Sequence, residues 1–305
     1  MTRRPVTLIV NPAAGGKPGS GPPLHEDPSR LTPEALEAEL RERGVEVETH
    51  VLTESDDPAA YARSAAAAGR DVVVAGGDGT VSNVASVLIT DPDATLGILA
   101  LGSFNNMARG FGVPTTLEAA LDAIAAGAST AVDCGWVVRD GGEGRPFFEA
   151  AGVGLDALGF LAAEIAERRG WRPAVRALWH GLRMRRTPMR ITIDDRTYRT
   201  GSPAVTVSNG PYHGLGFAIS ADADATDGVL DVAIFSGMSR LDVLRHFLAV
   251  ARHHPRREAR VSGHRARRVV IEGRRRALPA HADGTNIGTT PVTLEVRPGA
   301  LRIFR

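Results

Sequence analysis

The sequence predicts an α/β N-terminal domain with a mainly parallel sheet, followed by a β-rich C-terminal domain that carries a helical insertion. Three observations support this prediction. Short apolar runs alternate with helical patterns up to about residue 126, and strand-like segments dominate after Gly127. A helical pattern over 157–186, with breaks near Gly170 and Pro173, interrupts the strands of the second part.

The first part gives the clearest pattern. Val6–Val10 is a continuous apolar run that ends at Asn11-Pro12, which is typical of a buried strand. Leucines at 36 and 40 lie among charged residues and predict an amphipathic helix over 31–43, which Gly44 ends. Further strands are expected at 45–52, 72–75 and 96–101, and further helices at 58–68, after 80 through 88, and at 117–126. This alternation favours a doubly wound parallel sheet.

The second part reads as a series of strands separated by turn residues. They are expected at 132–138, 147–151, 189–193, 204–208, 229–235, 267–272 and 292–296, with a further helix at 240–253. The expected domains are 1–128, 129–296, and a C-terminal strand at 297–305.

Composition excludes several classes of protein. The 305 residues are 43% hydrophobic and 23% charged, which is the ordinary globular range. The formal net charge of +1 gives no reason to expect nucleic acid as a partner. Cys134 is the single cysteine and cannot form an internal disulfide, which indicates a reducing compartment. The sequence contains no run of about 18 apolar residues that could span a membrane, so we expect a cytoplasmic protein.

Three loops each follow a predicted strand of the first domain. They are 11–17, which contains Gly15-Gly16-Lys17, then 76–80, which reads Gly-Gly-Asp-Gly-Thr, and 101–109. The carboxyl ends of parallel strands meet at one edge of a sheet, where such folds bind ligands. Glycines let the backbone approach a phosphate closely, and helix N-termini supply free N–H donors. The three loops therefore predict a site for nucleotide phosphates.

Asp78 is an acidic side chain in a loop otherwise suited to anions. This placement favours a role toward a metal or a ribose hydroxyl. A helix cap is the purely structural alternative.

At this point the chain resembles the diacylglycerol kinase-like lipid kinases, which include bacterial diacylglycerol kinases and the sphingosine kinase catalytic domain. The resemblance covers nearly the whole chain and keeps the family's order and spacing of motifs. It is carried by the Asn11-Pro12 loop, 76–80, 102–109, 152–156, 227–231 and Asp283-Gly284. It implies an ATP-binding α/β domain of NAD kinase-like fold, a β-sandwich-like second domain, and an active site between them. It also implies that the final strand, near 301–304, returns to the first domain.

The resemblance implies ATP and Mg²⁺ as cofactors and a lipid alcohol as the substrate. Asp283 and Asp78 are implied to be catalytic. The implied nucleotide contacts are Asn11, Pro12, Ala13, Ala14, Gly15, Thr53, Gly76, Gly77, Asp78, Gly79, Thr80, Val81, Ser82, Ser103 and Asn105.

Three residues depart from the family pattern in these loops. Ser103 stands where the family usually has threonine, and Ser82 stands where it commonly has asparagine. Asn106 replaces an aspartate and so removes a charge beside the presumed substrate. The identity of the acceptor is therefore in more doubt than ATP binding.

Four aspartates, at positions 222, 224, 227 and 231, surround one turn of the second domain, where Gly228 allows a sharp bend. By resemblance, the family's structural magnesium falls on Asp224, Asp227 and the carbonyl of Val229. An acidic β-turn without metal is an equally good interpretation, since Asp and Gly suit turns by themselves.

Asp283 is the candidate proton acceptor of the second domain. The family typically has Asp-Gly-Glu here, but this chain has Thr285 in place of the glutamate. Threonine does not accept a proton at neutral pH without help, which leaves Asp283 as the base, with His281 able to assist or substitute. A simple Asp-Gly hairpin turn is the structural alternative.

Two basic segments bear on partners. Aromatic and aliphatic residues lie among arginines over 160–186; membrane docking is one interpretation of this segment, and a helix packed on its own domain is the commoner one. The run 252–276 is basic but has no aromatic residue, so it offers no platform for base stacking.

Two other functions remain open. A nucleotide-binding pseudokinase or scaffold is kept open by Thr285. An NAD kinase is less favoured, because no asparagine here precedes a glutamate. The sequence identifies neither the lipid acceptor nor the oligomeric state, for which a homodimer is one option, and peripheral contact with the inner membrane face is a further one.

Overall fold

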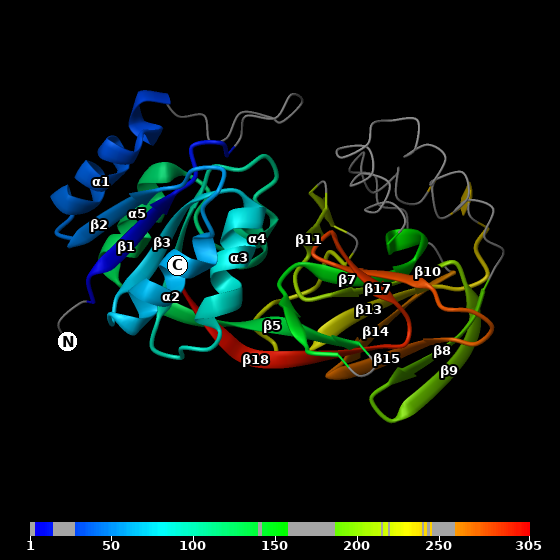
Figure 1. The fold of residues 1–305 in the computed structure, drawn as a ribbon. Helices are drawn as coiled ribbons and strands as arrows, with labels where there is room; N and C mark the ends of the chain where they lie inside the picture. Colours follow the sequence, from blue (N-terminus) through cyan, green and yellow to red (C-terminus); the bar gives the residue numbers. More distant parts are fainter. Residues whose placement is uncertain are drawn as a thin grey trace. The chain divides into compact units, whose positions relative to one another are not determined.

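The computed structural model describes residues 4–14, 28–139, 142–157, 187–214, 216–218, 220–239, 241–242, 245 and 260–305. The chain divides into two compact units (Figure 1). The N-terminal unit is Met1–Asp133 with Gly299–Arg305, and the C-terminal unit is Cys134–Pro298. The boundary falls inside strand β5 (Ser129–Arg139), whereas the sequence suggested a boundary just before that strand.

The N-terminal unit contains a parallel sheet in the order β2-β1-β3-β4. Its described elements are β1 (Val6–Val10), η1 (Pro28–Leu31), α1 (Pro33–Glu42), β2 (Val47–Val51), α2 (Pro58–Ala67), β3 (Asp71–Gly76), α3 (Asp78–Leu88), β4 (Thr95–Ala100), α4 (Asn106–Gly110), α5 (Leu117–Ala126), the start of β5 and the end of β18 (Val292–Phe304). In β18, Arg302 and Ile303 pair in parallel with β4. The end of the chain therefore extends this sheet beyond β4.

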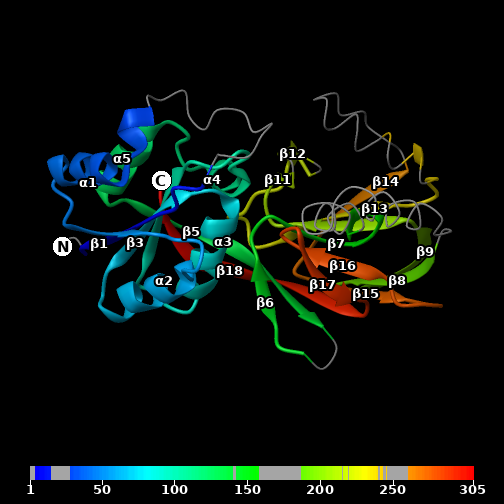
Figure 2. The same cartoon turned by 45° about the horizontal axis from the view of Figure 1, so that its top comes forward.

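Helices cover both faces of this sheet. Helices α1 and α5 contact each other and lie on one face, and α2 and α3 pack together on the other (Figures 1 and 2). Alternate strand residues form a core with α1 and α5, including Leu8, Val73 and Leu99. Thr32 caps α1 by accepting a hydrogen bond from the Ala35 N–H, which explains where that helix begins.

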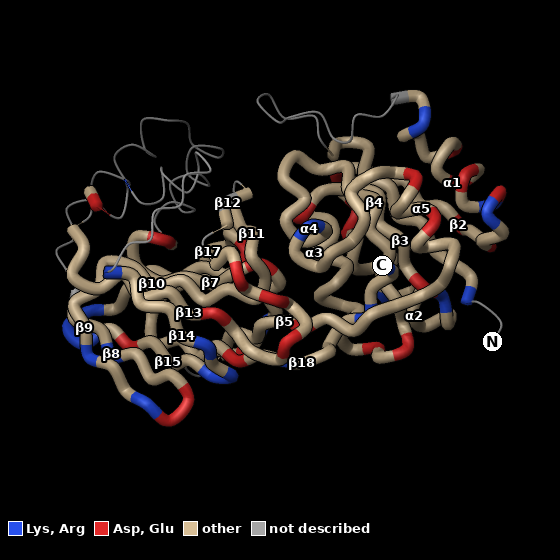
Figure 3. The backbone as a smooth tube through the Cα atoms, turned by 180° about the vertical axis from the view of Figure 1, so that it is seen from behind, with Lys and Arg blue, Asp and Glu red and all other residues tan. Residues whose placement is uncertain are grey.

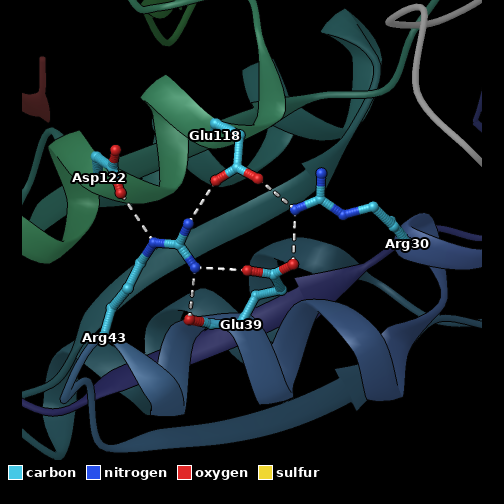
Figure 4. Close-up of polar contacts among 5 residues, drawn as sticks. All are labelled: Arg30, Glu39, Arg43, Glu118 and Asp122. Atoms are coloured by element: carbon cyan, nitrogen blue, oxygen red, sulfur yellow. Dashed lines mark hydrogen bonds and ion pairs between the residues drawn. The ribbon is translucent and has the colours of Figure 1, made fainter.

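Charged side chains also join α1 to α5 (Figure 4). The Arg43 guanidinium contacts Glu39 and Glu118 at 2.5 Å each and Asp122 at 2.9 Å. Arg30 contacts Glu39 and Glu118, each at 2.6 Å. These hydrogen bonds lower the pKa of Glu39 and raise that of Arg43. Two arginines and three carboxylates thus link segments far apart in the sequence.

The C-terminal unit is built from antiparallel strands. Its described strands are the rest of β5, β6 (Arg145–Phe147), β7 (Ala150–Gly154), β8 (Thr187–Ile193), β9 (Arg196–Ser202), β10 (Ala204–Ser208), β11 (Tyr212–His213), β12 (Phe217–Ala218), β13 (Leu230–Phe235), β14 (Val261–Ala266), β15 (Arg268–Gly273), β16 (Pro279–Ala282), β17 (Thr285–Thr289) and the start of β18. One sheet runs β14-β13-β10-β7-β16-β17, and in the other β18, β15, β8 and β9 are neighbours in that order.

These two sheets share one apolar core. Val153 and Val205 on the first sheet cluster with Ile191 and Val269 on the second. Residues of β7, β10 and β16 that belong to this core alternate with residues that point to the opposite face of their sheet. The arrangement is a β-sandwich in which the six-stranded sheet keeps one face away from the core.

The predicted fold class is confirmed, but several strands were missed. Strands β9, β14 and β17 were not expected, because their residues are mostly polar or exposed and show no apolar run. Strand β16 was missed because it has only four residues, although three of them are buried. The helical insertion expected at 157–186 lies, from residue 158 on, outside the described residues, as does most of the helix expected at 240–253. Among the described residues, no helix combines the length and apolar character needed to cross a membrane.

Candidate active site

The three loops of the N-terminal unit meet at the carboxyl ends of β1, β3 and β4. The Asn11 side-chain amide donates a hydrogen bond to Thr80 Oγ1 at 2.9 Å, which joins the first loop to α3. A Cβ added to Gly102 would lie 2.5 Å from the α carbon of Gly77, so the second and third loops are in direct backbone contact. These two glycines are therefore needed for loop packing, independently of any ligand.

Asp78 belongs to the first turn of α3, which begins earlier than the sequence suggested. Gly77 is the N-cap, and α3 has no side-chain cap. The Asp78 carboxylate instead accepts a hydrogen bond from the Met107 N–H at 3.0 Å and so caps α4. Burial raises the pKa of Asp78, although backbone N–H groups of 105–107 oppose that shift. Asp78 therefore acts as a helix cap, but for the neighbouring helix α4 and not for its own helix α3.

Asn105 shapes the third loop from within. Its backbone is left-handed, with φ 51°, and its side chain accepts a hydrogen bond from the Gly102 N–H at 2.8 Å. The same side chain donates to the carbonyls of Ala100 and Gly102. The amide of Asn105 is thus engaged inside the loop.

Gly79 differs from its neighbouring glycines. It is exposed in the first turn of α3, and a Cβ at this position would meet no atom within 4 Å. Its φ lies outside the left-handed region, so neither packing nor backbone conformation requires glycine here. The Thr80 and Val81 N–H groups bond to the Gly77 carbonyl, so the Gly79 N–H is the first-turn donor best placed for an anion.

The other predicted nucleotide contacts differ in exposure. Pro12, Ala13 and Thr53 are exposed, Ala14, Ser82 and Ser103 are half-buried, and Val81 is part of the core. The Thr53 hydroxyl donates to Asp56 at 2.7 Å within a local turn. Gly15 lies outside the described residues.

A cavity of about 270 Å³ adjoins the first loop. Asn11, Pro12 and Ala14 line one part of it, and Val10, residues 31–33 and Leu101 line the rest. The first loop therefore borders open space as well as its neighbouring loops.

In the C-terminal unit, Asp283 lies at the tight turn between β16 and β17. Its φ of 45° and that of Gly284, 71°, give the left-handed turn that Asp-Gly favours. Its carboxylate accepts hydrogen bonds from the N–H groups of Phe148, Glu149 and Ala150 at 2.7, 2.9 and 3.2 Å. Burial raises the pKa of Asp283, and these donors oppose the shift. Asp283 is thus part of an Asp-Gly hairpin turn, and its carboxylate is also held in place by three backbone donors.

A row of residues crosses three strands close to Asp283. Thr206 on β10 lies opposite Gly152 on β7, and Gly152 lies opposite His281 on β16. The Asp156 carboxylate sits over this row: its Oδ2 accepts a hydrogen bond from Thr206 at 2.8 Å and lies 3.3 Å from His281 Nε2. A Cβ at Gly152 would be 2.0 Å from that oxygen. Gly152 therefore provides the space for the Asp156–His281 pair.

Further buried polar groups lie on or near the same face. Ser208 pairs with Ala150, in register with Asp283, and its hydroxyl has no hydrogen-bond partner among the described residues. His213 is 3% exposed, and burial lowers its pKa to about 4. Sequence reasoning did not single out Thr206, Ser208 or His213. For Thr206 and Ser208 the available signal was polar residues at alternate positions of the apolar strand β10. His213 is in the two-residue strand β11, which shows no such pattern.

The acidic turn is bound by other groups. Asp227 accepts a hydrogen bond from the Val229 N–H and forms an ion pair with Arg265. Asp224 accepts from the backbone and hydroxyl of Thr226. Arg265 pairs with Oδ2 of Asp227, so a cation at Asp224 and Asp227 would have to share that carboxylate with the guanidinium or replace it. Among the described residues, no group of three or more His, Cys, Asp or Glu side chains could hold a metal ion.

Arginines of the C-terminal unit lie beside acidic residues (Figure 3). Arg268 on β15 contacts Glu295 at 2.8 Å, and Arg190 on β8 contacts Glu272 at 3.5 Å. The described part of the basic run 252–276 is thus partly neutralised by its neighbours.

Comparisons with known proteins place this geometry in a family. Residues 5–137 match the diacylglycerol kinase catalytic domain, and residues 153–305 match the YegS C-terminal NAD kinase beta sandwich-like domain. The chain is 30% identical to a diacylglycerol kinase from Mycobacterium tuberculosis H37Rv, covering 98% of this chain and 94% of that protein. The chain belongs to the diacylglycerol kinase-like lipid kinase family. It is therefore a lipid kinase, which is a phosphotransferase.

Other members and fold neighbours agree with this family assignment. A protein named "Probable lipid kinase YegS" from Salmonella typhimurium is 28% identical, over 99% of this chain and 96% of that protein. The crystal structure of a diacylglycerol kinase from Bacillus anthracis has a TM-score of 0.71 at 21% identity and covers 100% of this chain and 97% of that one. Yeast NADH kinase gives 0.52 at 12% identity over 99% and 83% of the two chains, so it is a neighbour in fold alone.

Proposed function

We propose that this lipid kinase transfers the γ-phosphate of ATP to the hydroxyl of a lipid alcohol such as diacylglycerol or a sphingoid base. The observation that carries the proposal is the Asp283 carboxylate, which three consecutive backbone N–H groups hold in place. Carboxylate oxygens have about four lone-pair positions, so one acceptor position remains for a substrate proton. A raised pKa makes this carboxylate a better proton acceptor.

ATP is proposed to bind at the three loops of the N-terminal unit. The first turn of α3 has no side-chain cap, and Gly79 leaves space above it. Uncapped N–H groups at a helix N-terminus suit phosphate oxygens. Asn105 is proposed to shape the third loop, while Asn11 holds the first loop against Thr80.

The transfer follows a balanced course. The acceptor O–H bond breaks and its proton passes to the Asp283 carboxylate, while the acceptor oxygen forms a bond to the γ-phosphorus. The bond between that phosphorus and the bridging oxygen breaks, and its electron pair stays on the β-phosphate of ADP. Mg²⁺ is proposed to arrive with ATP and to neutralise phosphate charge.

The hydroxyl of the lipid acceptor is proposed to lie near Ser208. The Ser208 hydroxyl is buried and has no hydrogen-bond partner among the described residues, and Ser208 stands in register with Asp283 across β7. A hydroxyl both donates and accepts, which matches another hydroxyl.

The direct test uses γ-labelled ATP, Mg²⁺ and the purified full chain. Mixed micelles would carry diacylglycerol, sphingosine or ceramide, and NAD would be offered in a parallel reaction. Label is expected in the lipid phase with at least one lipid alcohol. ATP binding without any labelled lipid would favour a pseudokinase, the alternative that Thr285 keeps open, and label in NAD would overturn the lipid acceptor.

A further inference from the structure

His281 and Asp156 lie deep in the C-terminal unit, next to the proposed base. His281 is 2% exposed and Asp156 is 7% exposed. An ionisable pair so far from water is costly unless each partner satisfies the other. Oδ2 of Asp156 contacts Nε2 of His281 and also accepts a hydrogen bond from the Thr206 hydroxyl.

The sheet register fixes where this pair lies relative to Asp283. Thr206 on β10, Gly152 on β7 and His281 on β16 form one row across the sheet. Two residues along these segments, Ser208, Ala150 and Asp283 form the next row. β16 ends at Ala282, and Asp283 begins the following turn with a left-handed backbone, φ 45°. His281 thus lies two residues before Asp283 in the chain, and its charge acts on the Asp283 carboxylate.

Glycine at position 152 shows that the contact is built into the fold. Its missing side chain leaves room for both partners, because a Cβ there would be 2.0 Å from Asp156 and 2.6 Å from His281. Glycine weakens a strand interior, and a close approach of other groups is a common reason to find it there.

We propose that Asp156 and Thr206 hold a protonated His281 beside Asp283, and that this charge keeps the Asp283 carboxylate ionised and ready to accept the proton of the lipid hydroxyl. The inference rests on the proposed function, in which Asp283 is the base. His281 acts through Asp283 and is a positioning residue. The imidazolium favours the ionised carboxylate, and Asp156 favours the imidazolium.

The other ionisable groups near this pair support that assignment. Burial and the charge of His281 lower the pKa of His213 to about 4, against the effect of Asp156, so His213 is uncharged near neutral pH. The Glu149 carboxylate accepts a hydrogen bond from the Gly214 N–H at 3.1 Å. Among these groups His281 is the one that faces Asp156 as an ion pair, and its charge lowers the pKa of Asp283 against the larger effect of burial.

The test is the pH profile of kcat/KM for lipid phosphorylation by the full-length protein. His281→Gln removes the positive charge, so the pKa of Asp283 rises and the acid limb moves to higher pH. Asp156→Asn is expected to move it in the same direction, and Thr206→Val to move it less. His264→Gln is the matched control, because His264 is a half-buried histidine on β14 that contacts Ser262 and the Tyr198 ring and makes no ion pair with Asp156.

Four outcomes separate the possibilities. A shift of the acid limb by about one pH unit in His281→Gln, with none in His264→Gln, supports the inference. An equal loss of activity at every pH, with a lower Tm, indicates packing alone and overturns it. If His281→Gln does not fold, the pH profile of Thr206→Val is used: a shift of the acid limb to higher pH supports the inference, and an equal loss of activity at every pH overturns it. A wild-type protein that labels no lipid refutes the proposed function itself.

Discussion

The backbones of Gly77 and Gly102 approach so closely that a Cβ added to Gly102 would lie 2.5 Å from the α carbon of Gly77. Backbone therefore meets backbone where the second and third loops join. Gly79, two residues away, has no such neighbour. The contrast separates glycines that serve packing from one that packing does not explain.

Gly79→Ala is expected to fold normally and to bind ATP at least about tenfold more weakly, because the added methyl group fills the space above the first turn of α3. Alanine should even raise the free energy of unfolding, by up to about 1 kcal/mol. Isothermal titration with ATP and thermal unfolding measure the two effects. Gly77→Ala is the matched variant, since its Cβ would meet Gly102 at 3.2 Å and should lower stability by about 1–3 kcal/mol. Wild-type ATP affinity in Gly79→Ala would refute this site.

Asp78→Asn should separate stability from activity. The amide oxygen can still accept from Met107, so the fold persists, but the charge is lost and lipid phosphorylation should fall. Because burial raises the folded-state pKa of Asp78, its stabilising contribution is full at low pH and is lost as the pH rises through that pKa. The Tm of the variant should therefore gain on that of the wild type as the pH rises above about 4, the ordinary pKa of an aspartate carboxyl. A variant that loses stability relative to the wild type as the pH rises would contradict this account.

The acidic turn should respond to Mg²⁺ only after Arg265 is removed. In the absence of nucleotide, Mg²⁺ is expected to leave the wild-type Tm unchanged, because Arg265 already pairs with Asp227. Arg265→Ala should make the Tm rise with Mg²⁺. Conversely, stabilisation of the wild type by Mg²⁺ that disappears in Asp224→Asn would establish the metal set expected from the sequence.

Arg43→Met should loosen the contact between α1 and α5 and cost roughly 1 kcal/mol at low salt, with a smaller effect at high salt. The lowered pKa of Glu39 means that its stabilisation exists above the unfolded pKa and is lost as the pH falls through the folded one. The variant should therefore lose less stability on acidification. Arg41→Met is the control, because Arg41 pairs with Glu37 within α1. Equal effects of the two substitutions in chemical denaturation would argue against the network.

The sequence predicted the N-terminal unit well because most of its strands are buried apolar runs and its first two long helices, α1 and α2, have side-chain caps. Val6–Val10 has the expected bounds, and α1 begins after Thr32, which accepts from Ala35. Strands such as β9 and β14 were missed since they pair through the backbone while exposing polar side chains. Periodicity in one segment does not reveal such pairing.

The candidate site was predicted where it follows from strand order and missed where it depends on register. Loops after parallel strands must share an edge, so the contact of Asn11 with Thr80 is a natural consequence. The meeting of Asp156 with His281 requires knowing that Gly152 stands between Thr206 and His281. That alignment across three strands is not encoded in any local pattern.

The most direct test of the account compares ATP binding and lipid phosphorylation in Asp283→Asn. The amide keeps the size of the side chain but accepts no proton, so the account predicts an unchanged Kd for ATP and a fall of about a hundredfold or more in kcat. Phosphorylation of the lipid at the wild-type rate by a correctly folded Asp283→Asn protein would contradict it.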